Sequence, residues 1–397
     1  MYLKNLELKN YRNYDHIGLE FDKDSILLVG NNGNGKTNLL EAVHYLSTGR
    51  SHRTHMQDEL IKWGRDYFLL RGTIVSGNKK RKHLVEVEVR KKNNLKIKVD
   101  GVYRKKKTDF MSILPSVIFS PDDLRIIKAD PGERRAFLDS ILEIVQKDYS
   151  TTRLQYQKIL TQRNSLLKSA TGSLKSSHLK TLDAWNDNLV RYGLDLIIRR
   201  IELLGSLKDV FASHIESFFK NISPQIQYVF SWERNGKNGP SQDKQLYDPR
   251  SPETGKIPID RQELALAFKS RLEENLEQDL IRKSTTIGPH RDDIAISFDG
   301  RDIRSFGSQG QQRVAAISLK LCEIQVLKDR LSTDPVLLLD DVLSELDVER
   351  RRKLVDIIND RFQTFVTATN ISYLDKLEID FGSRFLVKDN IITKMGL

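Results

Sequence analysis

The chain has 397 residues, of which 39% are hydrophobic and 30% are charged, enough for two domains or for one large domain with an insertion. No apolar run approaches the roughly 18–20 residues of a membrane span, and the first residues lack the apolar region of a signal peptide. We therefore expect a cytoplasmic, nucleoid-associated protein without membrane contact. The single cysteine, Cys322, excludes a disulfide framework and is expected to pack in the core.

The first motif is a glycine-rich loop. The segment ILLVGNNGNGKTNLLEAVHYL, residues 26–46, predicts a buried strand, a loop and an amphipathic helix. Its loop fits the spacing G-x-x-x-x-G-K-[ST] in full, which predicts backbone N–H groups turned toward nucleotide phosphates at a helix N-terminus. In such a loop Lys36 reaches the β- and γ-phosphates, and the hydroxyl of Thr37 is a ligand of Mg²⁺. The candidate nucleotide-binding residues are Gly30, Asn31, Asn32, Gly33, Asn34, Gly35, Lys36, Thr37 and Asn38.

The next segment, residues 79–107, carries most of the net charge of +11. It holds 13 Lys or Arg and 3 Asp or Glu, a local charge of +10, so the rest of the chain is nearly neutral. Alternating apolar residues on both sides of KKNN predict a β-hairpin with one apolar face. The charge favours a polyanion, and we interpret the hairpin as a DNA-binding surface, the alternative being a solvated face. The candidate DNA-binding residues are Lys79, Lys80, Arg81, Lys82, Arg104, Lys105, Lys106 and Lys107.

From about residue 131 to 285 the pattern becomes helical. Apolar residues recur at three and four positions over 134–167 and 179–219, with few helix breakers. Residues 221–232 alternate like a strand, and residues 235–258 have the composition of a polar loop. These segments predict a compact helical lobe inserted into the domain that begins with the glycine-rich loop.

The segment SFGSQGQQRVAA, residues 305–316, precedes another helical pattern with two glycines, two serines and three glutamines in eight positions. Ser308 offers a hydroxyl, Gly310 a close backbone approach, and the helix that begins near Gln311 the positive end of its dipole. Alone, these residues are more typical of a loop that caps its own helix. Beside the nucleotide motifs, we favour contact with an anionic group.

The segment PVLLLDDVLSELD, residues 335–347, predicts a buried strand that ends at Asp340 and Asp341. By itself it also fits a strand followed by a helix that Ser344 and Asp347 cap. Beside a P-loop, we interpret it as a Walker B strand neighbouring the P-loop strand. Asp340 would hold Mg²⁺, and Asp341 would orient or deprotonate the attacking water. The P-loop lysine and Asp340 lie 304 positions apart, so a long insertion interrupts the sheet.

The motifs resemble those of ABC-type ATPases. GSQGQQR at 307–313 resembles their signature motif, and SELD at 344–347 resembles their D-loop. In that superfamily the signature loop of one subunit covers the γ-phosphate held by the P-loop of another. The resemblance therefore implies that Ser308, Gly310 and Gln311 bind nucleotide, and that the catalytic residues are Lys36, Asp341, Ser308 and Asp347.

A finer resemblance is to the bacterial RecF recombination-mediator family. It is carried, in the order of that family, by LKNYRNY at 8–14, VGNNGNGKTNLLEAV at 29–43, TGRSHR at 48–53, FSPDDLRIIKADPGERRAFLD at 119–139, TIGPHRDD at 286–293 and LLLDDVLSELD at 337–347. It implies an α/β fold: an ABC-type P-loop ATPase head with antiparallel β-hairpins and an inserted compact helical second lobe. The implied domains are 1–130 and 286–397 for the two halves of the head and 131–285 for the lobe.

The same resemblance implies an ATP-dependent homodimer that uses ATP and Mg²⁺. Such a dimer binds double-stranded DNA and single-/double-strand junctions next to gaps, and with RecO and RecR it helps to load RecA in replication, recombination, repair and the SOS response. Arg12 would lie near the nucleotide, and His290 and Arg291 near the active face. From its residues alone, His290 equally fits a loop histidine satisfied by its neighbours.

The resemblance implies a weak, DNA-dependent ATPase whose slow hydrolysis drives release, and three departures from the ABC pattern argue against fast, transporter-like turnover. Thr369 stands where ABC proteins carry a switch histidine, the segment VIFSPDDL at 117–124 has no glutamine, and Asp341 replaces the usual glutamate. The alternatives are a transporter subunit, a cohesin-like tether and a nuclease of the overcoming-lysogenisation type. The first lacks its glutamine and histidine here, the second its long coiled coil, and the third a further acidic domain.

Overall fold

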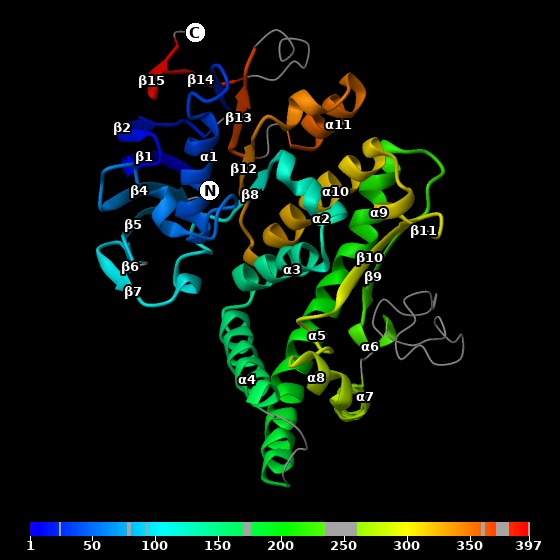
Figure 1. Cartoon of the computed structure of the whole chain (residues 1–397). Coiled ribbons are helices and arrows are strands. Elements are labelled where there is room, and N and C mark those ends of the chain that lie inside the picture. Colours follow the sequence, from blue (N-terminus) through cyan, green and yellow to red (C-terminus); the bar gives the residue numbers. More distant parts are fainter. Residues whose placement is uncertain are drawn as a thin grey trace. The chain divides into compact units, whose positions relative to one another are not determined.

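The computed structural model describes residues 1–23, 25–77, 81–92, 94–169, 176–234, 260–358, 362–370 and 381–395. The chain forms two compact units (Figure 1). We call residues 1–123 with 316–397 the first unit, and residues 124–315 the second unit. The compact units divide the chain at 123/124 and 315/316. The predicted domain limits at 130/131 and 285/286 stay a prediction.

An antiparallel sheet forms one part of the first unit, with strand order β2-β1-β4-β5-β6-β7. The predicted basic hairpin is confirmed as β5 and β6. Val85, Val87 and Val89 of β5 pair with Val99, Ile97 and Leu95 of β6, so the apolar side chains share one face. The strands are β1 (Tyr2–Tyr11), β2 (Tyr14–Glu20), β4 (Tyr67–Ser76), β5 (Arg81–Arg90), β6 (Asn94–Val99) and β7 (Val102–Arg104).

A second sheet in the first unit carries both nucleotide motifs, with order β15-β14-β3-β13-β12-β8. All neighbours are parallel except β14 and β15. The strands β3, β8, β12 and β13 are short runs in which every residue is buried, as expected of strands covered on both faces. The six strands of this sheet are β3 (Ile26–Val29), β8 (Ser116–Phe119), β12 (Val336–Leu339), β13 (Thr364–Ala368), β14 (Ser383–Lys388) and β15 (Ile391–Lys394).

Helix α1 (Lys36–Thr48) contacts strands of both sheets. A Cβ atom added at Gly72 of β4 would lie 2.1 Å from the Leu46 side chain, so the helix packs directly on the antiparallel sheet. This packing fixes the start of α1, where the glycine-rich loop ends. The other helical segments are α10 (Gln309–Leu331), which runs from the second unit into the first, α11 (Val348–Ile358), η1 (Gln57–Leu60), η2 (Lys107–Asp109), η3 (Pro121–Asp123) and η4 (Val342–Glu345).

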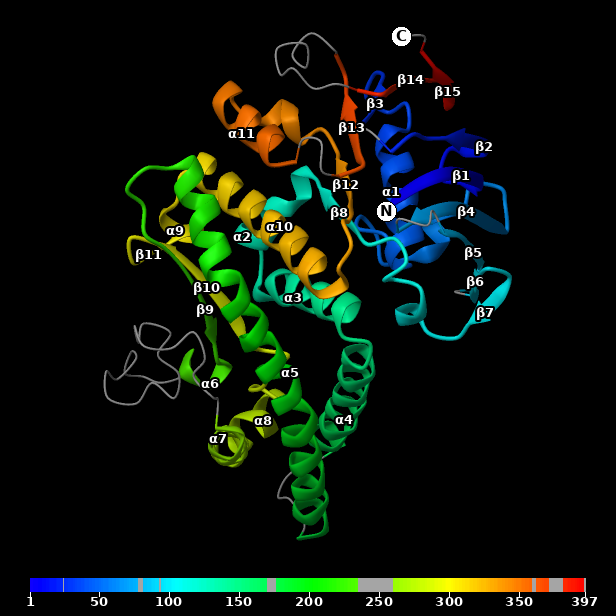
Figure 2. The ribbon, with the colours of Figure 1, turned by 180° about the vertical axis from the view of Figure 1, so that it is seen from behind.

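The second unit is mainly helical, as predicted, and it contains a small antiparallel sheet of order β11-β10-β9 (Figure 2). The predicted strand at 221–232 is confirmed as β9 (Pro224–Val229), whereas the predicted loop at 235–258 lies outside the described residues. The other elements are α2 (Leu124–Lys128), α3 (Pro131–Val145), α4 (Tyr149–Ser169), α5 (Ser176–Phe218), α6 (Ser231–Arg234), α7 (Arg261–Glu274), α8 (Leu276–Arg282), β10 (Asp293–Phe298), β11 (Arg301–Asp302) and α9 (Ile303–Phe306). Cys322 is buried, as expected. Within the described ranges, no helix is both long and apolar enough to span a membrane.

Candidate nucleotide site

The glycine-rich loop connects the buried end of β3 with the first residue of α1. At Gly30 an added Cβ atom would lie 2.1 Å from the carbonyl oxygen of Val387, so a larger residue would separate the loop from β14. Gly35 has φ of 103°, and its added Cβ would lie 2.5 Å from the side chain of Asn13. Only glycine combines that dihedral angle with that proximity, so the packing explains both positions.

The amine of Lys36 lies against the loop that precedes it. Its Nζ donates hydrogen bonds to the carbonyl oxygens of Gly30 at 2.6 Å and Asn31 at 3.2 Å. Burial lowers the pKa of Lys36, while the charges of Asp341 and Asp340 oppose that shift. Among the described residues no side chain caps α1, which starts at this lysine. The first-turn N–H groups are therefore available to an anion.

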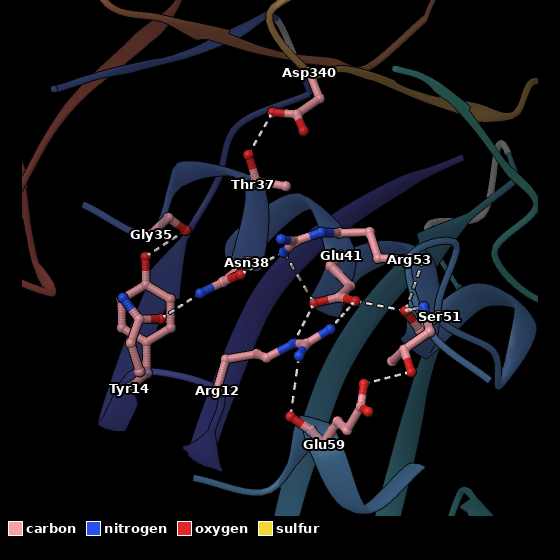
Figure 3. Close-up of polar contacts among 12 residues, drawn as sticks. Arg12, Tyr14, Gly35, Thr37, Asn38, Glu41, Ser51, Arg53, Glu59 and Asp340 are labelled. Atoms are coloured by element: carbon pink, nitrogen blue, oxygen red, sulfur yellow. Dashed lines mark hydrogen bonds and ion pairs between the residues drawn. The ribbon is translucent and has the colours of Figure 1, made fainter. Parts of the chain in front are cut away.

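The P-loop threonine meets the Walker B strand. The hydroxyl of Thr37 donates to Oδ1 of Asp340 at 3.0 Å, although the two residues are 303 positions apart (Figure 3). The prediction that β12 neighbours the P-loop strand is wrong, because β13 lies between β3 and β12. From β13, the hydroxyl of Thr367 lies 3.1 Å from Oδ1 of Asp340 and accepts the backbone N–H of Asp341 at 2.8 Å. Sequence reasoning missed Thr367, which lies inside a strand that looked purely structural.

The two aspartates differ in how their oxygens are satisfied. Burial raises the pKa of Asp340, and hydrogen bonds from Thr37 and Thr367 limit the rise. Asp341 has a left-handed backbone with φ of 53°, and its buried Oδ1 has no hydrogen-bond partner among the described residues. A buried carboxylate oxygen without a partner is costly, so this oxygen suits a bound cation or a polar ligand.

The described residues contain no group of three or more His, Cys, Asp or Glu that could hold a metal ion. Mg²⁺ commonly keeps several waters and is bound through one or two protein oxygens and substrate phosphates. The Thr37 hydroxyl and the Asp340 carboxylate fit that kind of site, beside the partnerless oxygen of Asp341. The roles predicted for these three residues stay predictions.

A polar cluster supports the first turns of α1 (Figure 3). Arg12 donates from Nε and Nη2 to the two oxygens of Glu41, each at 2.8 Å, and from Nη1 to the carbonyl of Glu59 at 3.0 Å. Burial alone would raise the pKa of Glu41, but the hydrogen bonds of Arg12 and Ser51 hold it below its usual value. Asn38 accepts from Arg53 at 2.9 Å. The predicted contact of Arg12 with nucleotide stays a prediction, since its fork is engaged by Glu41.

The signature-like loop caps its own helix. Ser308 and Gln311 bond reciprocally, with the Gln311 N–H donating to the Ser308 hydroxyl at 3.2 Å and the Ser308 N–H donating to Gln311 Oε1 at 2.8 Å. The helix begins at Gln309, two residues earlier than predicted. Ser308 and Gln309 are exposed. The capping alternative therefore describes this chain alone, and the predicted contact of Ser308, Gly310 and Gln311 with a nucleotide stays a prediction.

Comparisons with known proteins are consistent along the whole chain. The family model described as RecF/RecN/SMC N terminal domain matches residues 2–389. The DNA replication and repair protein RecF of Clostridium botulinum is 38% identical over 396 residues, covering 100% of both chains. The chain belongs to the RecF family. The RecF of Natranaerobius thermophilus is 37% identical and covers 94% of this chain and 92% of its own.

Solved structures agree with the family. Two structures of the recombination mediator protein RecF in the RecFOR pathway, named as its ATP and ATPrS forms, are 34% identical to this chain and cover all of it and 98% of their own chains. Their TM-scores are 0.85 and 0.84. An Smc head domain from Pyrococcus furiosus is 14% identical, with a TM-score of 0.53, and shows the fold alone. The predicted RecF resemblance and ABC-type head are thus confirmed.

Two other predicted residues have local partners. Oδ1 of Asp347 accepts the N–H of Arg350 at 2.9 Å and caps α11, while the hydroxyl of Ser344 donates to the carbonyl of Asp341 at 2.6 Å. The helix-cap alternative is thus realised by Asp347, without Ser344. The predicted catalytic role of Asp347 in a RecF protein stays a prediction.

His290 has two neighbours inside the second unit. Its Nδ1 lies 2.7 Å from the hydroxyl of Tyr156, and its Nε2 lies 3.1 Å from the carbonyl oxygen of Thr285. Burial lowers the pKa of His290 to about 3, so the ring is neutral at physiological pH. The alternative of a loop histidine satisfied by its neighbours describes this geometry. Thr369 follows β13 and is exposed.

The candidate DNA-binding cations of the basic segment 79–107 do not all lie on the surface. The amine of Lys107 donates to the carbonyl of Gly49 at 2.7 Å, at the end of α1. Lys79 and Lys80 lie outside the described residues. The exposed candidates are Arg81, Lys82, Arg104, Lys105 and Lys106, whose contact with DNA stays a prediction.

Proposed function

We propose that this member of the RecF family is an ATP-dependent DNA-binding protein of DNA replication and recombinational repair. The observation that carries the proposal is the hydrogen bond from Thr37 to Asp340, which joins a complete P-loop to the carboxylates at the end of β12. RecF relatives are named as DNA replication and repair proteins, and solved RecF structures as ATP and ATPrS forms, which supports the same assignment.

In the proposed site the backbone of the glycine-rich loop and the uncapped start of α1 bind the phosphates of ATP. Lys36 leaves its loop carbonyls to contact the β- and γ-phosphates. Thr37 and Asp340 hold Mg²⁺, which neutralises charge on the phosphates. Asp341, whose Oδ1 has no partner in the described residues, orients the attacking water and accepts its proton.

The proposed active form is a homodimer that assembles on ATP. Ser308 and Gln309 are exposed at the start of α10, where a γ-phosphate held by another copy of the chain can be reached. Ser308, Gly310 and Gln311 would then supply donors that the P-loop of the second copy lacks. Aspartate in place of glutamate at position 341, and threonine at 369, favour slow turnover, so hydrolysis serves release.

The proposed substrate surface is duplex DNA beside single-strand gaps, with RecO and RecR as partners in loading RecA. Two observations support this part of the proposal. The solved RecF structures are named as members of the RecFOR pathway, and the basic segment 79–107 exposes Arg104 at the end of β7 and Lys105 and Lys106 after it. Such cations bind phosphates without reading the base sequence.

The decisive measurement is the mass of the protein in solution with and without a slowly hydrolysed ATP analogue. We expect a monomer without nucleotide, a dimer with the analogue, and no dimer for Ser308→Arg, which places a long cation where the two surfaces close. Lys23→Arg, an exposed change in the first unit, is the matched control. An unchanged mass with saturating analogue would contradict ATP-driven assembly.

A second measurement tests the DNA surface. Reversal of Arg104, Lys105 and Lys106 to Glu should weaken duplex binding for all sequences alike and should flatten its salt dependence. Equal reversal of Lys158, Lys168 and Lys180, which are exposed on the second unit, is the control. If this triple variant keeps its duplex affinity, residues 104–106 form a solvated face and do not bind DNA.

A further inference from the structure

The second unit contains a polar cleft where the segments 119–139 and 286–293, which have no part in the nucleotide site, come together. It has a volume of about 470 Å³ and is lined by residues of α3, α6 and α8 and of the segment between α8 and β10. Three arginines line it, Arg135, Arg282 and Arg291, against one carboxylate, that of Asp130. The labels α3, α6 and α8 locate these elements in Figure 2. The cleft therefore has a local excess of positive charge.

Two of the three guanidinium groups are not neutralised. Arg282 and Arg291 are exposed, and among the described residues neither guanidinium group has a hydrogen-bond or ion-pair partner, although the backbone N–H of Arg291 donates to the carbonyl of Gly288 at 2.7 Å. Arg135 is half-buried and donates from Nη1 to the carbonyl oxygen of Asp292 at 2.5 Å, which leaves its other donors free of a carboxylate. Burial, and then the nearby charge of Arg200, lower the pKa of Arg135, while the charges of Asp292 and Asp293 oppose that shift. Three guanidinium groups beside one carboxylate give the cleft an excess of positive charge, which favours an anion.

The acidic side chains behind the cleft are already engaged. Asp279 accepts from Nη1 of Arg163 at 2.6 Å and from the backbone N–H of Thr286 at 2.8 Å. Asp292 accepts from the hydroxyl of Tyr228 at 2.7 Å and from the N–H of Ser231 at 2.8 Å. These buried carboxylates therefore have partners of their own, and although the charge of Asp292 acts on Arg135, neither forms an ion pair with Arg282 or Arg291.

The same network fixes the loop that carries Arg291. His290 is held between Tyr156 and Thr285, and Thr286 is bonded to Asp279 through both its backbone and its hydroxyl. Arg291 thus starts from a backbone that needs little reordering when a ligand binds, which favours affinity.

The start of α3 contributes to the same cleft through Pro131 and Gly132. This helix has 15 residues, and the side chain of Asp130 at its N-cap makes no capping hydrogen bond. Its dipole adds partial positive charge to that of the arginines. No aromatic side chain lines the cleft, so it offers no surface on which a base could stack.

We propose that this cleft binds a backbone phosphate of DNA, with Arg282 and Arg291 as its principal donors and Arg135 behind them. The inference rests on the proposed function in that it takes DNA as the ligand. Guanidinium forks match phosphate oxygens in pairs, and an open cleft without a stacking surface suits a phosphodiester better than a free nucleotide. Contacts of this kind position DNA and carry no sequence information.

The first test removes the two exposed charges. Duplex affinity of Arg282→Gln/Arg291→Gln should fall by about tenfold to a hundredfold at 0.1 M salt, and the slope against log salt should fall by about two. The control Lys158→Gln/Arg301→Gln removes equal charge from exposed positions of the same unit and should bind like wild type. Because both target arginines are exposed and unpaired, the melting temperature should not change.

The second test uses a variant that should gain affinity, which misfolding does not explain. Asp130→Asn removes the one carboxylate of the cleft and should tighten duplex binding by about threefold to tenfold, since phosphate repulsion is relieved. Asp183→Asn, an equal charge change at an exposed position of α5, should leave it unchanged. Equal gains for both variants would indicate general charge and would overturn the proposal.

The outcomes separate this inference from the proposed function. If wild type shows no salt-dependent duplex binding, the proposed function fails and the inference with it. If wild type binds and the double arginine variant binds equally well, the cleft alone is excluded as a DNA site. If that variant keeps duplex affinity but loses binding to poly-glutamate, the cleft serves an acidic protein, and its assignment to DNA is wrong.

Discussion

Two glycine-containing loops each precede a helix, and they treat the helix start in opposite ways. At α1 the N-cap is Gly35, with φ of 103°, and no side chain among the described residues caps the helix. At α10, Ser308 and Gln311 satisfy each other's backbone N–H groups. A glycine N-cap is only a few tenths of a kcal/mol less stabilising than a serine cap, so α1 gives up a small amount of stability that α10 retains. A helix whose first N–H groups lack partners, although the helix itself is well packed, offers a binding site for anions.

The two loops also differ in how far their partners lie along the chain. The P-loop is held by distant segments: Tyr14 donates to the carbonyl of Gly35 at 2.9 Å, Asn34 donates to the carbonyl of Val387 at 3.1 Å, and Thr37 reaches Asp340. The signature loop is held locally, with Gln312 donating to the carbonyl of Ile303 at 2.9 Å. The first loop is held by segments distant in the sequence, whereas the second is held by its own neighbourhood and keeps Ser308 and Gln309 exposed; under the proposed function, that exposed face meets another copy of the chain.

The strongest test of this comparison is Asp341→Asn. If the partnerless oxygen of Asp341 serves as a base, the variant should bind ATP but hydrolyse it about 10²–10⁴-fold more slowly. Nucleotide affinity and single-turnover hydrolysis should be measured on the same preparation. Wild-type hydrolysis in Asp341→Asn would show that the catalytic base is not the carboxylate that follows β12 beside the P-loop.

Lys36→Arg should have the next largest effect. The amine is only 4% exposed and is held by Gly30 and Asn31, where a planar guanidinium has no equivalent fit. We expect residual ATP binding and a loss of about 10²–10³-fold in kcat, because transition-state charge loses a positioned donor. Lys23→Arg is the control in steady-state assays. An active Lys36→Arg protein would show that this loop does not bind the transferred phosphate.

A mixture of two inactive variants tests whether the loops meet across subunits. A mixed dimer of Ser308→Arg and Lys36→Arg has one site with an intact P-loop from the first chain and an intact signature from the second. Each mixed dimer has one intact composite site of its two, so mixing should restore part of the wild-type ATPase activity although each variant alone has none. Titration of one variant with the other should give a maximum near equal amounts. A flat titration would contradict a shared site.

The sequence predicted what depends on local spacing. Gly30, Gly35 and Lys36 were recognisable because one short loop needs all three, and the apolar run before Asp340 predicted a buried strand. The order of the strands was not predictable, because the segment that separates β3 from β12 is β13, which begins at Thr364, beyond both motifs. Which parallel strands become neighbours depends on packing over the whole sheet.

Residues that act through distant contacts were missed for the same reason. Thr367 lies in the middle of an apolar strand, and its hydroxyl gains a role only when β12 brings Asp340 and Asp341 beside it. Glu41 looked like an ordinary helix residue until the turn after β1 placed Arg12 against it. A polar residue inside an otherwise apolar strand is the signal that would have identified Thr367.

The smallest expected effect separates capping from function at Ser308. Ser308→Ala should lower the free energy of unfolding by about 1 kcal/mol, because α10 loses its cap, and Asp260→Ala should cost the same at α7, where Asp260 accepts the N–H groups of Gln262 and Glu263. Ser308→Asp should retain stability, since aspartate caps as well as serine, yet it would direct negative charge at a γ-phosphate held by a partner copy. Chemical denaturation and ATPase assays of the three variants should therefore diverge. If Ser308→Asp keeps both its stability and its activity, the loop is a helix cap and nothing more. If it is stable and inactive while Asp260→Ala is less stable and active, the function of Ser308 lies outside its own helix.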